Sequence, residues 1–343
     1  MVEARTSATP VLDPAVRRRL QVRNPRAVGL DIAWTLLGLG LAFGIALGSG
    51  RWWGQLLGAF IAVAVQTRMA VLMHEAAHGL IAKMRRRNDA IANWLVVYPI
   101  GMTVARYRAD HLPHHTGLGT SADRDFTTLC VPPVEAGLRA SVLGVLTGAR
   151  HFKLLLKYAG GSSGDDVEAG EEAPPASQER TGGGVVGRAL WQVALLGVCV
   201  GASQPWTYFI VWLLPLLTVG VAINELRTIV EHTPILPEMS AGESRPLTPV
   251  TRTVRPGWFG RYWIGALYFH LHHEHHLFPA VPYSRLPELH RELVAQGYYA
   301  SNSDLLCDGY GDTLKRLWQR YEPKRARLRV ACAEDGSYTA RRE

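Results

Sequence analysis

Three clusters of histidine are the residues in this sequence best suited to chemistry. They are HEAAH at 74–78, HLPHH at 111–115 and HHEHH at 272–276. Within each cluster the histidines recur three or four positions apart, and residues at those offsets share one face of a helix. Because imidazole is the commonest protein ligand for metal ions, this repeated spacing predicts a metal site built from all three clusters.

The number of histidines indicates two metal ions rather than one. A closed zinc site takes about four ligands, and the clusters offer twice that many. The candidate ligands are His74, His78, His111, His114, His115, His272, His275 and His276. His270 and His273 fall off the shared helical face, so they are expected in a surrounding shell or at the surface. Imidazole suits zinc, copper, iron and nickel, so the residues alone leave the metal open.

The elements that position these clusters are expected to be membrane-spanning helices. Of the 343 residues, 48% are hydrophobic, and they gather in blocks at 28–48, 52–73, 190–202 and 206–223. About 20 apolar residues in a helix cross the hydrocarbon layer. The block at 190–202 is the shortest, and a buried soluble helix is its alternative interpretation. We predict an all-α integral membrane protein with four transmembrane helices in two hairpins and a cytosolic helical cap that carries the histidine-rich di-metal site.

Positive charge beside the blocks predicts the orientation in the cell membrane. The links at 48–51 and 203–205 hold only one basic residue, Arg51. The basic residues flank the other ends of the blocks: Arg17, Arg18, Arg19, Arg23, Arg26, Lys83, Arg85, Arg86, Arg87 and Arg227. By the positive-inside rule, both termini and the metal site are cytosolic. The net charge of +8 then suits lipid headgroups, and no nucleic-acid-binding module is recognisable.

The remaining segments are expected to be polar or interfacial. Residues 1–27 lack the apolar core of a signal peptide and form a cytosolic N-terminal segment, and 292–343 form a cytosolic tail. Residues 160–184, rich in Gly, Ser, Glu, Asp and Pro, are expected to be a disordered loop. Three apolar segments are candidates for helices lying at the membrane interface: 90–104, 134–158 and 258–269. The scattered cysteines predict neither a disulfide framework nor a thiolate metal site.

The motifs as a set resemble the three histidine boxes of membrane fatty acid desaturases, a family that includes hydroxylases and ketolases. HEAAH and HLPHH are similar to the first two boxes, and HLHHEHHLFPAVPYSRLPELH, at 270–290, is the most specific match. The resemblance extends over roughly 73–291 and places the desaturase domain at 28–291. In that family, eight box histidines and one isolated histidine after the fourth span hold two irons. The resemblance therefore implies a di-iron site and assigns the ninth ligand to His232.

The resemblance also concerns the residues around the ligands. Some relatives place an Asn one turn before the isolated histidine, where it holds a metal-bound water. Here that position is Thr228, which leaves the coordination of one iron open. Acidic residues near the boxes are expected to accept imidazole N–H bonds and so orient the rings: Glu75, Asp123, Asp125, Glu231 and Glu274. For Asp125 and Glu274, an interpretation as solvated charges is equally open.

The implied activity is the oxidation of an unactivated C–H bond in the acyl or alkyl chain of a lipid, with O2 as co-substrate. No haem-binding or flavin-binding domain is recognisable, so the two electrons would come from a separate ferredoxin or cytochrome with its reductase. The string Leu277-Phe278-Pro279 after the third box favours desaturation. Hydroxylation or ketolation of a lipid or isoprenoid by the same site is the alternative.

Two other classes of protein share part of the pattern. HEAAH fits the HExxH motif of zinc peptidases, with Glu75 as general base, but that class leaves the other two clusters unexplained. A metal transporter or store is a further alternative. Transporters place polar ligands inside their spans, whereas these clusters lie outside the apolar blocks. Chain length, carrier, double-bond position and oligomeric state have no recognisable signal in the sequence.

Overall fold

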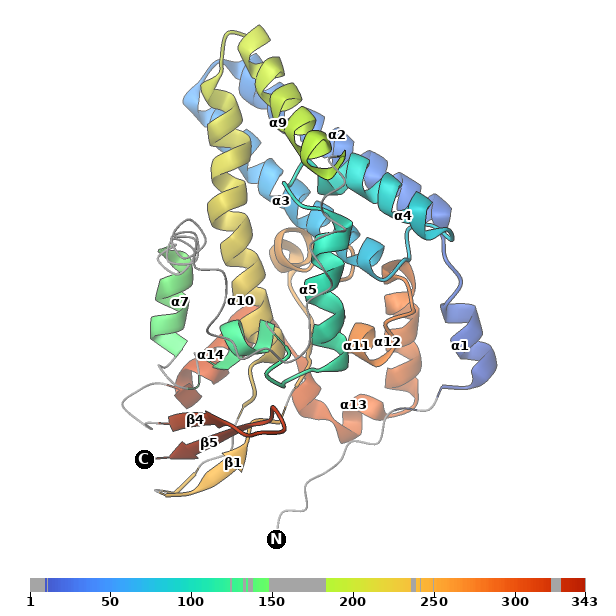
Figure 1. The fold of residues 1–343 in the computed structure, drawn as a ribbon, viewed down its shortest axis with the longest axis vertical. Helices are drawn as coiled ribbons and strands as arrows, with labels where there is room; N and C mark the ends of the chain where they lie inside the picture. The colour runs from blue at the N-terminus through green and yellow to red at the C-terminus, as the bar shows by residue number, and fades with distance from the viewer. Residues whose placement is uncertain are drawn as a thin grey trace.

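The computed structural model describes residues 10, 12–123, 125–131, 134, 138–147, 183–235, 239–240, 242–248, 250–321 and 328–342. Most of these residues are helical. Long helices extend to one end of the molecule, and a lobe of shorter elements gathers at the other (Figure 1).

Four helices of the described chain are long and apolar enough to cross a membrane. They comprise α1 (Pro14–Leu20) with α2 (Pro25–Ser49), then α3 (Trp52–Ala77), α9 (Gly183–Gly201), and a continuous helix made of η4 (Tyr208–Leu213), η5 (Leu216–Gly220) and α10 (Val221–His232). Each predicted apolar block coincides with one of them. The third helix begins at Gly183, well before the predicted 190, so its length is sufficient for a span.

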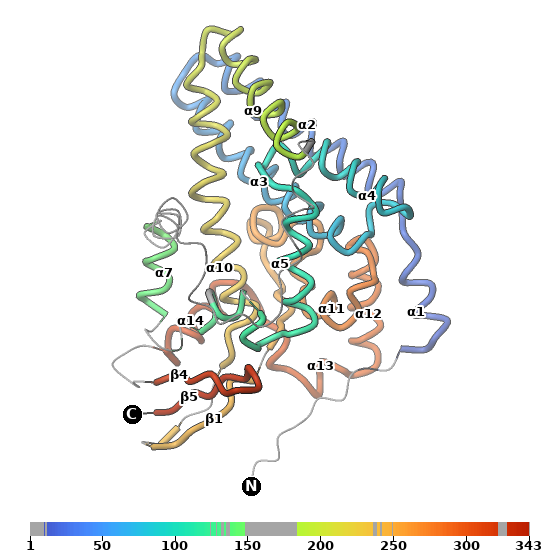
Figure 2. Tube along the Cα trace, viewed as in Figure 1, coloured from blue at the N-terminus to red at the C-terminus, as the bar shows by residue number. Residues whose placement is uncertain are grey.

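The two N-terminal long helices lie side by side (Figure 2). Gly50 ends α2 in a left-handed conformation with φ of +58°, which glycine adopts without steric cost. At Gly58 a Cβ atom would lie 2.6 Å from the backbone oxygen of Ala42. The close approach of α2 and α3 therefore requires glycine at this position.

The long helices expose large apolar side chains. On α2 and α3 these include Leu30, Trp34, Leu37, Leu41, Leu56 and Phe60. Contiguous apolar surface of this extent is unfavourable in water but matches hydrocarbon. The exposure supports assignment of these helices to a membrane.

One ion pair joins α2 to α3 among these apolar surfaces. Arg68 Nη2 lies 2.8 Å from Asp31 Oδ1, and Arg68 Nε donates to Thr35 Oγ1 at 3.1 Å. The other Asp31 oxygen, Oδ2, accepts a hydrogen bond from the hydroxyl of Tyr283 at 2.6 Å. The pair therefore connects both helices to the segment that follows the third histidine cluster.

The lobe is built from short helices and turns. In chain order they are α4 (Arg85–Ala92), η1 (Asn93–Val97), α5 (Val104–Thr116), η2 (Phe126–Cys130), α7 (Leu138–Leu146), η6 (Gly260–Ile264), α11 (His272–Leu277), η7 (Tyr283–Arg285), α12 (Leu286–Ala295), α13 (Tyr298–Ser301), η8 (Ser303–Leu305) and α14 (Tyr310–Tyr321). The predicted interfacial segment 90–104 is divided among the end of α4, η1 and a turn before α5. Only parts of 134–158 and 258–269 are helical in the described chain, as α7 and η6 with its flanking turn.

The lobe also contains short strands, so the prediction of an all-α fold was wrong in this respect. An antiparallel sheet has the strand order β1–β5–β4, from β1 (Ser244–Pro246), β4 (Leu328–Cys332) and β5 (Tyr338–Arg342). A parallel pair joins β2 (Thr253–Val254) to β3 (Leu306–Cys307). The signal missed in the sequence is Asp335-Gly336, a hairpin turn with Gly336 at φ of +79°.

Most of the predicted loop at 160–184 lies outside the described residues. Its last two residues, Gly183 and Gly184, belong to the first turn of α9.

Candidate metal centre

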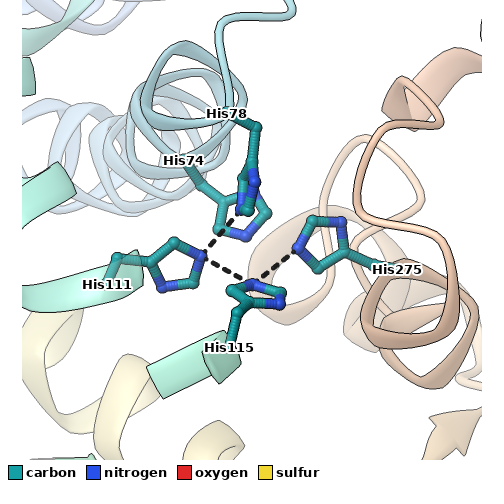
Figure 3. Close-up of side chains that lie close together, drawn as sticks. All are labelled: His74, His78, His111, His115 and His275. Atoms are coloured by element: carbon teal, nitrogen blue, oxygen red, sulfur yellow. Dashed lines mark hydrogen bonds between the residues drawn. The ribbon is translucent and has the colours of Figure 1, made fainter. Parts of the chain in front are cut away.

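The histidines of the three clusters come together at the lobe end of the long helices. They form two groups, and within each group the ligand atoms all lie within 4.8 Å of one another. The five-histidine group is His74, His78, His111, His115 and His275 (Figure 3). The four-histidine group is His114, His232, His272 and His276. All nine histidines named from the sequence are therefore in one of the two groups.

The division between the groups follows the helical turn. Residues four apart on an α-helix differ by about 40° around the axis, whereas neighbours differ by about 100°. His111 and His115 accordingly face the same group, and His114 turns to the other. In the third cluster His272 and His276 stay together, while His275 joins the opposite group.

The second cluster lies later in its helix than the sequence suggested. From the sequence alone, Asp110 could cap that helix, and Pro113 would then be tolerated if it fell in the first turn. Instead α5 begins at Val104, because the side chain of Thr103 accepts the N–H of Arg106 at 3.2 Å and caps the helix. Pro113 is inside the helix, close to its end, and Asp110 pairs with Arg106 one turn earlier.

The five-histidine group presents converging ring nitrogens. The Nε2 atom of His111 lies 3.0 Å from both His78 Nε2 and His115 Nε2, and His275 Nε2 lies 3.1 Å from His115 Nε2 (Figure 3). Both ring nitrogens of His74 are buried without a hydrogen-bond partner. Nitrogen lone pairs that converge without donors to satisfy them fit a cation.

The two groups share a border. The rings of His115 and His276 stack with centroids 4.3 Å apart and an interplanar angle of 20°. The ring of His114 lies 5.0 Å from that of His276. Two ions held by the groups would therefore be neighbours, as in a dinuclear centre.

Burial lowers the pKa of five of the histidines and so favours their neutral form. It lowers the pKa of His78 to about 4 and that of His115 to about 3, from an ordinary value of 6.5. For His111, His275 and His276, burial and then neighbouring rings lower the pKa well below 6.5. A neutral imidazole has a lone pair for a metal, so the rings are competent ligands at pH 7.

Asp123 orients one of the cluster histidines. Its Oδ1 accepts a hydrogen bond from His114 Nδ1 at 2.8 Å and one from Phe126 N at 3.0 Å, and its Oδ2 accepts from Gly119 N at 3.0 Å. Three hydrogen bonds thus hold the carboxylate, and the Nε2 atom of His114 remains as the one that can bind a metal. This is the role that the sequence suggested.

Replacing Asp123 with asparagine should weaken metal binding by the four-histidine group. The amide oxygen of asparagine holds the His114 ring less firmly than a carboxylate does. The amide NH2 would also face one of the two backbone N–H groups that Asp123 accepts, those of Gly119 and Phe126. Losing such an orienting partner typically costs about 10–100-fold in metal affinity. Iron per chain, measured against a graded series of chelators, checks this. Asp125→Asn is the matched control, because it removes a nearby carboxylate charge while the hydrogen bond between Asp123 and His114 remains. Equal iron affinity in Asp123→Asn and the wild type would contradict the role.

The other acidic residues named from the sequence have different contacts. Glu75 Oε2 accepts the backbone N–H of Tyr283 at 3.1 Å. Its Oε1 lies 3.7 Å from His74 Nδ1, which is beyond hydrogen-bond length. In the described chain, Asp125 makes no hydrogen bond to a cluster histidine. Of the five acids, only Asp123 accepts a hydrogen bond from one of these nine rings.

Glu274 belongs to a separate buried network. Its carboxylate accepts hydrogen bonds from Thr253, His290 and Tyr299. His273, one position earlier, bonds Thr251 Oγ1 at 2.6 Å through its Nδ1. Because these partners lie on or beside β2, α12 and α13, the side chains of His273 and Glu274 face those elements rather than the metal-binding groups.

His270 lies outside both groups and is buried. Its Nδ1 lies 3.1 Å from the backbone oxygen of Gly265. Like His273, it belongs to the interior around the groups rather than to the surface.

Two residues that border the groups, Phe269 and Arg227, were not predicted to lie there. The ring of Phe269 lies 4.6 Å from that of His74 and 5.2 Å from that of His272, so it contacts both groups. The guanidinium of Arg227 lies 4.4 Å from the centre of this ring. Arg227 was interpreted as a flanking charge, and neither residue is part of a spacing pattern.

Comparison with protein families gives one match. The family model for fatty acid desaturase matches residues 50–303, more than two thirds of the chain. The matched region contains both histidine groups. A comparison with curated proteins gave no match.

Proposed function

Because the chain belongs to the fatty acid desaturase family, we propose that it is a membrane-bound, di-iron, O2-dependent desaturase that introduces a C=C bond into a fatty acyl or alkyl chain. The observation that carries the proposal is the pair of adjoining histidine groups. Nine imidazole ligands in two sets suit two ions of the type that imidazole binds. The resemblance of the boxes to those of desaturases selects iron.

In this proposal the nine histidines hold the irons. Bound iron supplies the O2-dependent chemistry that breaks an unactivated C–H bond, for which protein side chains have no equivalent. The chain's own residues hold and orient the metal-binding rings, as Asp123 does for His114. The apolar ring of Phe269 borders both groups and excludes water on that side.

The proposed arrangement in the membrane is two hairpins with the lobe as a cytosolic cap. The links at 50–51 and 202–207 lie far from the lobe (Figure 1). The exposed basic residues Lys83, Arg85, Arg86 and Arg87 follow the end of α3 that carries His74. This distribution supports a cytosolic position for the site and both termini.

Electrons would come from a separate ferredoxin or cytochrome with its reductase. The exposed arginines of α4 support an acidic partner, since complementary charge speeds encounter. The same residues also suit anionic lipid headgroups.

A zinc peptidase is a poorer explanation of the site. The general base of that class must reach a metal-bound water. Here Glu75 is fully buried and accepts the backbone N–H of Tyr283. One zinc ion takes about four ligands, so it would also leave about half of the nine histidines unexplained.

Lipid mass spectrometry tests the proposed function directly. The protein is expressed in a host membrane with a reductase supply, and the lipids are compared with those of the host alone. Desaturation predicts a product lighter by two hydrogens. A product heavier by one oxygen would assign hydroxylation to the same site instead. The absence of any oxidised lipid, with both irons bound and reductant present, would contradict the proposal.

A further inference from the structure

The two histidine groups offer different numbers of ligands. One offers five rings and the other four. The sequence suggested Thr228 at the position where some relatives use Asn near the second ion. In the structure the Thr228 hydroxyl donates to the backbone oxygen of Asn224 at 3.0 Å, so it is bonded within its own helix. The Thr228 hydroxyl is therefore not a candidate for a further ligand, and other oxygen atoms near the four-histidine group come into question.

Glu231 lies at the edge of this group. It precedes His232 at the end of α10, and its side chain is 0% exposed. Arg227 donates to its Oε2, and the hydroxyl of Tyr310 donates to its Oε1 at 3.3 Å. These contacts fix the carboxylate, and Oε2 is also the oxygen nearest to His272.

The side of the His272 ring that faces Glu231 distinguishes a metal ligand from a carboxylate that only orients the ring. His272 Nε2 lies 2.8 Å from His232 Nε2 and 3.0 Å from His276 Nε2, so this atom faces the metal position. Glu231 Oε2 lies 3.7 Å from the same Nε2. An orienting carboxylate would contact the opposite nitrogen, as Asp123 does at His114 Nδ1. The Nδ1 of His272 is buried without a partner.

We propose that the carboxylate of Glu231 is an oxygen ligand of the metal ion held by the four-histidine group. The inference rests on the di-iron site proposed above. Imidazole nitrogen and carboxylate oxygen each lie about 2.0–2.2 Å from a bound divalent ion. Two ligands of one ion are therefore at most about 4.4 Å apart, and the 3.7 Å between Glu231 Oε2 and His272 Nε2 satisfies this limit for that pair. The carboxylate is not within 4.8 Å of all four histidine ligand atoms, so it would move toward the ion on binding.

The proposal makes the two metal positions chemically different. The five-histidine ion has nitrogen ligands only, whereas its neighbour gains one negative oxygen ligand. That oxygen lies between the Arg227 guanidinium and the histidines, so the carboxylate would compensate a cation on each side.

Iron counting on the purified full-length protein, loaded anaerobically with Fe(II), tests the assignment. The wild type should bind two irons per chain. Glu231→Gln keeps the shape but removes the charge, and it should retain one iron while binding the second at least about 10-fold more weakly. Glu274→Gln is the matched control, because Glu274 is also 0% exposed and flanks a cluster histidine, yet bonds only groups outside the clusters. It should bind both irons as tightly as the wild type.

Each result has a separate meaning. A wild-type protein that does not bind two metal ions would overturn the di-iron proposal itself. Two irons in the wild type, and unchanged affinity for both in Glu231→Gln, would overturn only the assignment of Glu231.

A measurement on the wild type decides the matter if Glu231→Gln does not fold. The infrared difference spectrum between metal-loaded and metal-free protein should contain a carboxylate band that shifts when glutamate is labelled with carbon-13. Where Glu231→Gln does fold, its difference spectrum should lack this band. A wild-type spectrum without a glutamate band would overturn the assignment.

Discussion

Replacing His115 with alanine should reduce formation of oxidised lipid by at least about 100-fold, the upper range for losing only an orienting neighbour of a metal ligand. The Nε2 of His115 lies 3.0 Å from that of His111 and 3.1 Å from that of His275, within the five-histidine group. Its ring also stacks on His276 of the four-histidine group. In the proposed di-iron site, one substitution would therefore remove a ligand from one ion and a packing surface from a ligand of the other.

The measurement is product formed per folded protein, with iron content determined in parallel. His290→Ala is the control, because His290 is on α12, belongs to neither group and is only partly buried. It should retain most of the activity and both irons. If His115→Ala formed product at the rate of the control, the ring could not be a metal ligand.

Replacing Asp31 with leucine should destabilise the protein strongly. Removing one partner of a buried ion pair typically costs about 3–5 kcal/mol, because the other charge remains unpaired. The side chains of Arg68 and Asp31 are 22% and 26% exposed, so we expect the lower end of that range. Asp31→Leu also removes the acceptor of the Tyr283 hydroxyl. The thermal unfolding midpoint in detergent should fall by several degrees.

The double variant Asp31→Leu/Arg68→Leu distinguishes the effect of an unpaired charge on stability from the effect of lost packing. With both charges removed, apolar side chains fill the space between α2 and α3, and the midpoint should recover toward the wild type. Tyr283→Phe removes only one hydrogen bond and should cost about 1 kcal/mol. A double variant no more stable than Asp31→Leu would show that the unpaired arginine is not the cause.

Much of the helical framework could be predicted, because an apolar block of about 20 residues has few interpretations other than a membrane-spanning helix. The blocks at 28–48 and 52–73 coincide with α2 and α3. The start of α9 was missed because its first turn is rich in glycine, which disfavours a helix locally. The strands β4 and β5 were missed because strands of five residues carry too little alternation to stand out in a tail.

That the nine histidines come together was predictable, but their division into two groups was not. Spacing of three and four predicts that the histidines of one box lie near one another, and the structure agrees. It does not say that His114 and His275 turn toward a different group from their neighbours, since that depends on how α5 and α11 are rotated against α3. His232 has no histidine partner at helical spacing, so only the resemblance pointed to it.

The residues that border the rings were the hardest to foresee. Phe269 reaches His74 through a turn in which Leu267 and Tyr268 have φ of +51° and +63°. Non-glycine residues rarely adopt this conformation, so no local propensity predicts the turn. Tertiary packing around the histidines decides it.

The division of neighbouring histidines between two groups has a mechanical consequence. His114 and His115 are joined by one peptide unit, as are His275 and His276, yet the members of each couple serve different groups. Consecutive Cα atoms are fixed about 3.8 Å apart. Two peptide units of fixed length, one on α5 and one on α11, therefore tie the two histidine groups together. If the long helices tilted around a bound lipid, these two links would hold the backbones that carry the groups at a constant separation.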